Sequence, residues 1–280
     1  MTNSLGMNAL SQTAEERFGI KADPDDVEKL QKYIQDSYGR TGPEIIEKVF
    51  SSGEAAGFLT VNETYFFREP AHFSFLLDLL PSFEETGIRI CSAAVACGCE
   101  AYSIAMLIEA YNRSAIKPVS YHIDAFDINP KVIETACRGI FTTRALREDG
   151  SCFRYMADPY LVKLENGYQI DPALREKICF FVHNLMDELP PRREYDLIFF
   201  RNAFIYFSHR YRERVISNLA AVLKRGGHLI LGVSETAGVH YAGIEAKNRN
   251  DVFYFQKPIA AGLSGGKPAE KSIYRSENVV

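Results

Sequence analysis

The stretch "IRICSAAVACGCEAYSIAM", residues 88–106, decides the fold class. It starts with "IRICSA", a short and mostly apolar run that predicts a strand. A turn of small residues around Gly98 follows, and Ile104, Leu107 and Ile108 then share one face of a predicted helix. A strand, a tight turn and a helix in this order are typical of the first unit of an open α/β sheet.

The same alternation continues along the chain. Further strands are predicted at "YHIDAFDI", "KICFFVHNL", "EYDLIFFRNAF", "GGHLILGVSE" and "DVFYFQK", and helices at "NPKVIETAC" and "HRYRERVISNLAAVLK". Strands that alternate with helices predict a parallel sheet with right-handed crossovers. The runs "DLIFF" and "HLILGV" are continuously apolar, as strands buried on both faces should be.

The residues before this region have helical patterns. Residues 23–38, "DPDDVEKLQKYIQDSY", place Val27, Leu30 and Ile34 on one face of an amphipathic helix. The runs "GPEIIEKVF" and "PAHFSFLLDLLPSF" predict two more helices. Residues 1–12 show no periodicity, so we expect them to be irregular.

These patterns divide the chain. We predict a small all-helical N-terminal domain at residues 13–57, a linker with a connecting helix at 58–87, and an α/β domain at 88–257. The run "KLENGYQI" holds Asn-Gly between strand-like arms, which indicates a β-hairpin insertion around residues 139–177. Residues 258–280 are rich in Gly, Ser and Lys, and we expect a disordered tail.

The composition disfavours several classes of protein. The chain has 280 residues, of which 46% are hydrophobic and 24% charged, an ordinary globular mixture. A net charge of −4 disfavours binding to nucleic acid, and no apolar run is long enough for membrane insertion. The start lacks a secretory signal, which favours a cytoplasmic protein. The six cysteines form no C-x-x-C pair, and no histidine lies at metal-ligand spacing from the cluster of three cysteines. No metal site is therefore expected.

Polar side chains follow the predicted strands, where open α/β sheets bind ligands. Glu100 starts the helix after the first strand, and Asp127, Asn184 and Asn202 come at or just after the ends of the next three. Asp127 is placed to accept hydrogen bonds from ribose hydroxyls, although it could instead cap the following helix. Leu185 could pack on a base. A nucleoside-containing ligand is predicted, and the missing G-x-G-x-x-G motif disfavours a nicotinamide oxidoreductase.

The linker stretch "FLTVNETYFFREP", residues 58–70, mixes polar groups with three consecutive aromatic residues. The aromatic side chains are expected to anchor the linker by core packing. Arg68 is different, because a buried guanidinium without an anionic partner is costly. We therefore expect Arg68 to face a carboxylate, which it could bind in bidentate form.

Together, "TVNETYFFREP", "SAAVACGCEAYSIAM", "FDINPKVIETACRGIF", "HNLMD", "YDLIFFRNAFIYF" and "LKRGGHLILGVSE" resemble the CheR family, the chemotaxis receptor glutamate methyltransferases of bacteria. The resemblance covers residues 58–256. It implies a Rossmann-like S-adenosylmethionine-dependent methyltransferase domain with a mostly parallel sheet, helices on both faces and an antiparallel last strand. It also implies a cytoplasmic monomer that methylates glutamate carboxylates in the cytoplasmic region of a methyl-accepting chemoreceptor and releases S-adenosylhomocysteine.

The resemblance also indicates individual residues. We hypothesise that Arg68 mainly orients a carboxylate and that Tyr206 borders the methyl-transfer site, which makes both candidate catalytic residues, although Tyr206 could be a wall residue only. A glutamate side chain is already anionic at pH 7, so the reaction needs little acid–base help. The residues that would contact the cofactor are Asn62, Thr64, Arg68, Glu100, Asp127, Asn184, Leu185, Asn202 and Ala203.

The sequence departs from the family pattern in ways that leave alternatives open. "GCEAYS" replaces the usual "GEEPYS", with Cys99 and Ala101 as the new residues. Residues 1–60 hold six Lys or Arg against ten Asp or Glu, where many relatives have an arginine-rich helix. A diverged protein or small carboxylate substrate, or a cofactor-binding regulator without catalysis, therefore remains an alternative. The hairpin insertion could dock a peptide as an added strand or be a structural flap.

Overall fold

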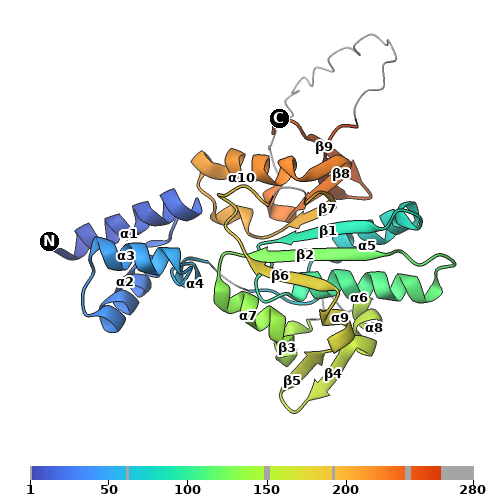
Figure 1. The fold of residues 1–280 in the computed structure, drawn as a ribbon, viewed down its shortest axis with the longest axis horizontal. Helices are drawn as coiled ribbons and strands as arrows, with labels where there is room; N and C mark the ends of the chain where they lie inside the picture. The colour runs from blue at the N-terminus through green and yellow to red at the C-terminus, as the bar shows by residue number, and fades with distance from the viewer. Residues whose placement is uncertain (1, 61–62, 148–151, 191–192, 237–240, 260–280) are drawn as a thin grey trace, which may run out of the picture.

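The computed structural model describes residues 2–60, 63–147, 152–190, 193–236 and 241–259 (Figure 1). The N-terminal part is helical, with apolar residues of its helices forming one cluster around Leu10, Leu30 and Ile34. Residues 2–12 were expected to be irregular, which is wrong, because they form most of the first helix. The helices are α1 (Thr2–Phe18), α2 (Pro24–Tyr38), α3 (Pro43–Ser51) and α4 (Ala56–Leu59).

A seven-stranded sheet forms the centre of the α/β part, in the order β6-β2-β1-β7-β8-β10-β9. The first five of these strands pair in parallel, and β10 is antiparallel to β8, which confirms the predicted antiparallel last strand. The order of the strands reverses direction at β1, with β2 on one side and β7 on the other. The strands are β1 (Ile88–Ala93), β2 (Tyr121–Asp127), β6 (Ile178–Val182), β7 (Tyr195–Phe200), β8 (Leu223–Leu231), β9 (Glu245–Arg249) and β10 (Val252–Gln256).

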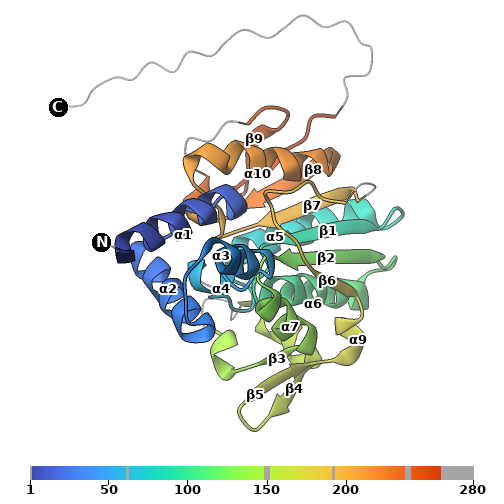
Figure 2. The same ribbon diagram turned by 60° about the vertical axis from the view of Figure 1, so that its left-hand side comes forward.

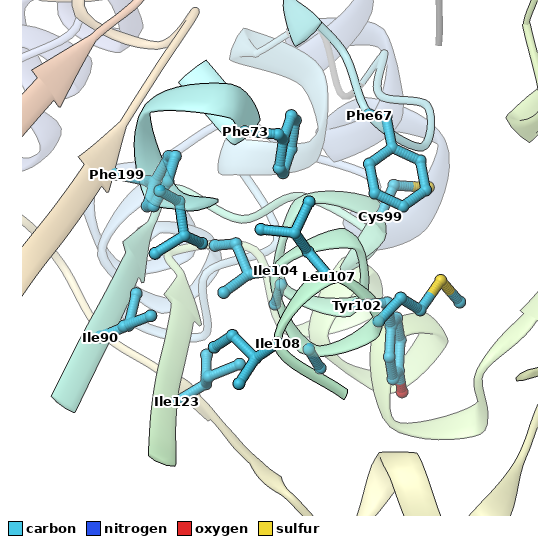
Figure 3. Packing of buried hydrophobic residues seen from close by; sticks show 14 of the residues in the cluster. Phe67, Phe73, Ile90, Cys99, Tyr102, Ile104, Leu107, Ile108, Ile123 and Phe199 are labelled. Carbon is cyan, nitrogen blue, oxygen red and sulfur yellow. The ribbon is translucent and has the colours of Figure 1, made fainter. Parts of the chain in front are cut away.

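Helices cover both faces of the sheet, as predicted. On one face Ile104 and Ile108 of the helix after β1 belong to the same buried cluster as Ile90 and Ile123 (Figure 3). On the other face, a second cluster joins Val215 of the last helix to strand residues. The first face carries α5 (Pro70–Leu79), α6 (Cys99–Ser114) and α7 (Pro130–Arg138), and the second carries α10 (His209–Ala221). Among the described helices none is long and apolar enough to cross a membrane.

A separate three-stranded antiparallel sheet confirms the predicted hairpin insertion, and Figure 1 shows it away from the main sheet. Its central strand starts at Gly167, directly after Asn166 in the turn. A Cβ on Gly167 would lie 2.0 Å from the carbonyl oxygen of Phe141, so only glycine fits there. The elements of this region are β3 (Ile140–Phe141), α8 (Arg154–Ala157), β4 (Leu161–Leu164), β5 (Gly167–Ile170) and α9 (Pro172–Arg175).

The N-terminal helices lie at the carboxyl ends of the parallel strands (Figure 2). The segment after α1 is fastened to the segment after β7: Ser208 N donates to Gly19 O at 2.8 Å, and Lys21 N donates to Tyr206 O at 2.9 Å. Gly19 has φ of 71°, and a Cβ there would lie 2.7 Å from Met186 Sδ. The helices are thereby held over the edge of the sheet where ligands bind in this fold class. The tail was predicted to be disordered over residues 258–280, and residues 260–280 of it lie outside the described residues.

Candidate active site

A cavity that is open to solvent lies between the carboxyl ends of the strands, the linker and the N-terminal helices. Phe18 and Ile20 of the N-terminal part also line it, and no pattern in the sequence indicated this. Asn62 lies outside the described residues. The predicted site residues that line the cavity are Thr64, Arg68, Glu100, Asp127, Asn184, Leu185, Asn202, Ala203 and Tyr206.

Asp127 holds the loop that follows β1. Its Oδ2 accepts a hydrogen bond from Ala96 N and its Oδ1 accepts one from Asn129 N, both at 3.0 Å. The N-cap of α7 is Asn129, which accepts from Lys131 N, so Asp127 does not cap this helix. Burial raises the pKa of Asp127, and the backbone donors oppose that change. Each carboxylate oxygen can accept a further hydrogen bond, so ribose hydroxyls can still bind.

Arg201 is the buried arginine of the site, and its side chain is 1% exposed. Its Nη1 lies 2.9 Å from Glu100 Oε2 and its Nη2 lies 3.1 Å from Glu69 Oε2. The same guanidinium donates to the carbonyl oxygen of Arg68 and lies over the Phe73 ring. The cost of burying an unpaired guanidinium therefore concerns Arg201, since Arg68 is only half-buried.

Asn202 is held in a left-handed conformation, with φ of 56°, by two glutamates. Its backbone N donates to Glu235 Oε2 at 2.7 Å, and its Nδ2 donates to Glu69 Oε1 at 2.9 Å. Glu235 is buried and also accepts from Gly232 N at 2.8 Å and Ile205 N at 3.1 Å. Sequence reasoning missed both glutamates. Glu69 lies before a helix rather than after a strand, and Glu235, although it comes after β8, reaches Asn202 from a distant part of the chain.

The aromatic residues of the linker anchor it, as expected for at least two of them. Phe66 and Phe67 are each 1% exposed. The ring of Phe66 packs against Phe141, with centroids 5.0 Å apart. Tyr65 instead lines the cavity, and the Arg68 guanidinium lies 5.7 Å from the centroid of its ring. The linker is thus fixed by its buried rings while Arg68 faces the cavity.

Arg68 and Tyr206 lie close to each other on the cavity wall. Burial raises the pKa of Tyr206, and the positive charge of Arg68 opposes that change. Arg68 Nη1 donates to the carbonyl oxygen of Glu63 at 3.1 Å, which leaves its other donors for a ligand. The pair can therefore receive an anionic group at the mouth of the cavity.

Asn184 connects the two parts of the protein. Its Nδ2 donates to the carbonyl oxygen of Arg17 at 2.8 Å, and its Oδ1 accepts from Met186 N at 3.0 Å. These bonds fix the orientation of the amide at the cavity wall. Leu185, which follows, is 5% exposed and packs in the core beside the cavity.

The contribution of Glu69 to stability should depend on pH. Burial raises the pKa of Glu69, but contacts with His72, Arg201 and Asn202 outweigh burial and hold the pKa below its ordinary range. The stabilisation is therefore complete above the unfolded-state pKa of about 4.3 and is lost as the pH falls toward the lower folded-state value. In urea unfolding, the stability difference between wild type and Glu69→Gln should be larger at pH 7 than at pH 3.5. An equal difference at both pH values would contradict this.

Comparison with protein families decides the identity of this site. The family model "CheR methyltransferase, SAM binding domain" matches residues 62–248. The chain belongs to this family. S-adenosylmethionine is accordingly the cofactor of the CheR domain. The groups that line the cavity fit this molecule: there are hydrogen-bond acceptors for its hydroxyls and ammonium group, apolar walls, and a guanidinium for a carboxylate.

Several curated relatives of this CheR domain are methyltransferases by name. The chemotaxis protein methyltransferase of Borreliella burgdorferi is 34% identical over 64% of this chain and 65% of its own length. The probable chemotaxis protein methyltransferase of Rhizobium etli is 33% identical over 74% of this chain and 82% of its own length. The probable biofilm formation methyltransferase WspC of Pseudomonas aeruginosa is 32% identical, over 67% of this chain but only 44% of its own length.

Proposed function

We propose that this protein transfers a methyl group from S-adenosylmethionine to glutamate side chains of a chemoreceptor-type protein. The products would be a glutamate methyl ester and S-adenosylhomocysteine. The observation that carries the proposal is the convergence of Arg68, Tyr206 and the polar strand-end residues on one cavity in a CheR domain. Because the methyl-accepting region of such receptors is cytoplasmic, the proposal assigns the enzyme to the cytoplasm.

The cavity wall suggests how the cofactor is held. Bound S-adenosylmethionine supplies an electrophilic methyl group on a sulfonium. Asp127 would accept hydrogen bonds from the ribose hydroxyls, and Leu185 would pack on the adenine. Glu100 would accept from the ammonium group, because its oxygens keep acceptor capacity beyond the bonds from Ser92 and Arg201.

The residues of the protein would then position the second substrate. A glutamate carboxylate is anionic at pH 7 and needs no general base. Arg68 would align its oxygen with the methyl group and partly replace its hydration, while Tyr206 would form the facing wall. Because Arg68 is only half-buried, its hold on the carboxylate is moderated by solvent, so the oxygen keeps its nucleophilicity.

The direct test uses methyl-labelled S-adenosylmethionine and membranes from a host strain that lacks this gene. Label should enter membrane protein and leave as methanol under mild base, since carboxyl methyl esters are base-labile. Heat-denatured enzyme is the control. Cofactor binding without any label in membrane protein would contradict the receptor substrate and favour a diverged substrate or a non-catalytic regulator.

One observation favours a diverged substrate as the second candidate. On the solvent face of α2, Lys29 and Lys32 alternate with Asp25, Glu28 and Asp36. Exposed basic residues of the N-terminal helices are also engaged in surface ion pairs, such as that of Arg17 with Glu47. A face of mixed charge steers an acidic receptor segment weakly.

The hairpin insertion supports a further proposal, that β4 docks a peptide of the substrate protein as an added strand. β4 pairs with β5 on one side, and no described strand pairs with its other side. Val162 of β4 is 52% exposed. Fluorescence titration with carboxyl-terminal receptor peptides tests this, and a protein that binds none of them would favour a structural flap.

Replacing Asp127 with asparagine should weaken binding of S-adenosylhomocysteine by about 10- to 100-fold, the value of a hydrogen-bond pair to a charged group. Asparagine keeps the size of the side chain, and its oxygen can still accept one backbone bond. Isothermal titration calorimetry measures the affinity, with the exposed Asp158→Asn variant as the control. Unchanged affinity in Asp127→Asn would remove Asp127 from the cofactor site.

A further inference from the structure

Two thiols lie side by side in the loop between β1 and α6. The Sγ atoms of Cys97 and Cys99 are 4.0 Å apart. Cys97 is half-buried, whereas Cys99 is fully buried. Gly98 between them has φ of 94°, a left-handed conformation that forms the turn between the two cysteines.

Cys99 is connected to the linker that borders the cofactor cavity. Its thiol contacts the side chain of Thr64, which lines the cavity. Its carbonyl oxygen accepts a hydrogen bond from Ser103 Oγ at 2.7 Å, and the same hydroxyl accepts from Phe67 N at 2.9 Å. Figure 3 shows Cys99 and Phe67 at the same end of α6. A displacement of Cys99 would therefore reach the linker next to Arg68.

The loop with the two thiols also carries groups of the cavity wall. Ala96 lines the cavity directly before Cys97, and its N donates to Asp127 Oδ2 at 3.0 Å. Glu100 lines the cavity directly after Cys99. A change in the geometry of the two cysteines would thus alter both the ribose side and the ammonium side of the cofactor site.

We propose that Cys97 and Cys99 form an oxidation site, at which a hydroperoxide closes a disulfide and thereby weakens binding of S-adenosylmethionine. The inference rests on the cofactor site described above and adds a redox regulation of cofactor binding there. Both cysteines are needed, because the sulfenic acid that forms on the first thiol becomes a disulfide only by reaction with the second.

The chemistry requires only the two thiols and the peroxide. The thiolate of Cys97 attacks one peroxide oxygen, the O–O bond breaks, and the products are a sulfenic acid on Cys97 and hydroxide or an alcohol. The sulfur of Cys99 then attacks the sulfur of Cys97, which forms the S–S bond. The sulfenic hydroxyl leaves with the proton of Cys99 as water. The two sulfurs lose two electrons, and the peroxide gains them.

The environments of the two thiols set the order of these steps. The hydrogen bond with Cys99 holds the pKa of the Cys97 thiol below its ordinary value, despite burial. Burial raises the pKa of Cys99. Cys97 is also the more accessible of the two, and a thiolate reacts where a thiol does not. Cys97 is therefore the first to react, and Cys99 resolves the sulfenic acid.

Closing the disulfide must move part of the cofactor site. The sulfurs have to approach from 4.0 Å to about 2.05 Å. The turn between them has little room to shift as a unit, because a Cβ on Gly98 would already lie 2.9 Å from Ala136 Cβ. The approach therefore draws Cys99 from Thr64 and disturbs the first turn of α6, where Glu100 lies.

The experiment measures thiol state and cofactor affinity in the full chain. The reduced protein is treated with hydrogen peroxide and then catalase, and free thiols are alkylated before mass spectrometry. We expect a link between Cys97 and Cys99, with fragment ions that leave Cys91 alkylated. Affinity for S-adenosylhomocysteine, measured by calorimetry, should fall at least tenfold and return after dithiothreitol.

Variants separate the two thiols. Cys97→Ser should bind S-adenosylhomocysteine like the wild type and should not respond to peroxide. In Cys99→Ala, dimedone should trap a sulfenic acid on Cys97, because nothing resolves it. Cys152→Ser, at an exposed cysteine elsewhere, should keep the full response.

Three results would overturn the inference alone: no Cys97–Cys99 link after peroxide, a link with unchanged affinity, or a loss of affinity that persists in Cys97→Ser. Reduced wild-type protein that binds no S-adenosylhomocysteine would instead overturn the cofactor site together with the inference. The readouts contain no methyl transfer, so a wrong receptor substrate would leave this test intact.

Discussion

Replacing Arg201 with methionine should lower the free energy of unfolding by about 3–5 kcal/mol, the usual effect of removing one partner from a buried ion pair. The Arg201 side chain is 1% exposed and contacts carboxylates from two distant segments, Glu69 and Glu100. Methionine fills similar volume but leaves both carboxylates without their cation. Affinity for S-adenosylhomocysteine should fall as well, because Glu100 loses the bond that orients it.

Urea unfolding measures the first effect, and Arg138→Met is the matched control. Arg138 pairs with Glu134 on the surface of α7, where both side chains are more than half exposed. Its replacement should change stability by less than about 1 kcal/mol. The double variant Glu69→Gln with Arg201→Met should be less destabilised than the sum of the single variants, since they share one interaction. An Arg201→Met protein as stable as the control would show that the pair contributes no net stability.

The strand-end residues could be predicted from the sequence because topology alone brings them together. Apolar runs fixed the strands around Asp127, Asn184 and Asn202, and parallel strands place their carboxyl ends at one edge of the sheet. That edge is where the cavity lies. The distances between these side chains, and which of them contact a ligand, depend on the conformation of the loops. The hydrophobic periodicity of the sequence carries no information on that conformation.

The polar network beneath the cavity could not be predicted in this way. Arg201 meets Glu69 across 132 positions of the chain, and Glu235 reaches back to Asn202. Such contacts depend on how α5 and the loop after β8 pack on the sheet, and no local pattern encodes them. Glu69 itself has φ of 58°, so the linker turns at the residue that holds the network.

The predicted limits of helices were wrong where the local sequence pattern was weak. The start of α1 has few apolar residues, so its helical period was not visible, yet Leu10 and Ala14 are fully buried against the other N-terminal helices. The predicted helix 209–224 ends at Ala221, and β8 begins at Leu223. There the pairing of Leu223 with Tyr195 of β7 outweighs helix propensity.

Replacing Arg68 with alanine should lower turnover by about 10²-fold at saturating cofactor, the effect of misplacing a reacting group by roughly 1 Å. Arg68 lies on the cavity wall beside Tyr206. Because the Arg68 side chain is half-buried and donates a hydrogen bond to the Glu63 carbonyl oxygen at the surface, the free energy of unfolding should change by less than about 1 kcal/mol. The turnover of Arg68→Lys should lie between those of the wild type and Arg68→Ala, because lysine keeps the positive charge but lacks the planar guanidinium that binds a carboxylate in bidentate form.

The division of the Arg68 effect between substrate and cofactor distinguishes its two candidate roles. If Arg68 mainly orients the substrate carboxylate, Arg68→Ala should lose turnover while its affinity for S-adenosylhomocysteine stays within about threefold, well below the tenfold that 1.4 kcal/mol represents. If it mainly binds the carboxylate of the cofactor, affinity and turnover should fall together. Arg113→Ala is the control, because Arg113 also lies over a tyrosine ring, that of Tyr160, but outside the cavity lining. Full turnover in Arg68→Ala would remove Arg68 from the mechanism and leave Tyr206 as the remaining candidate.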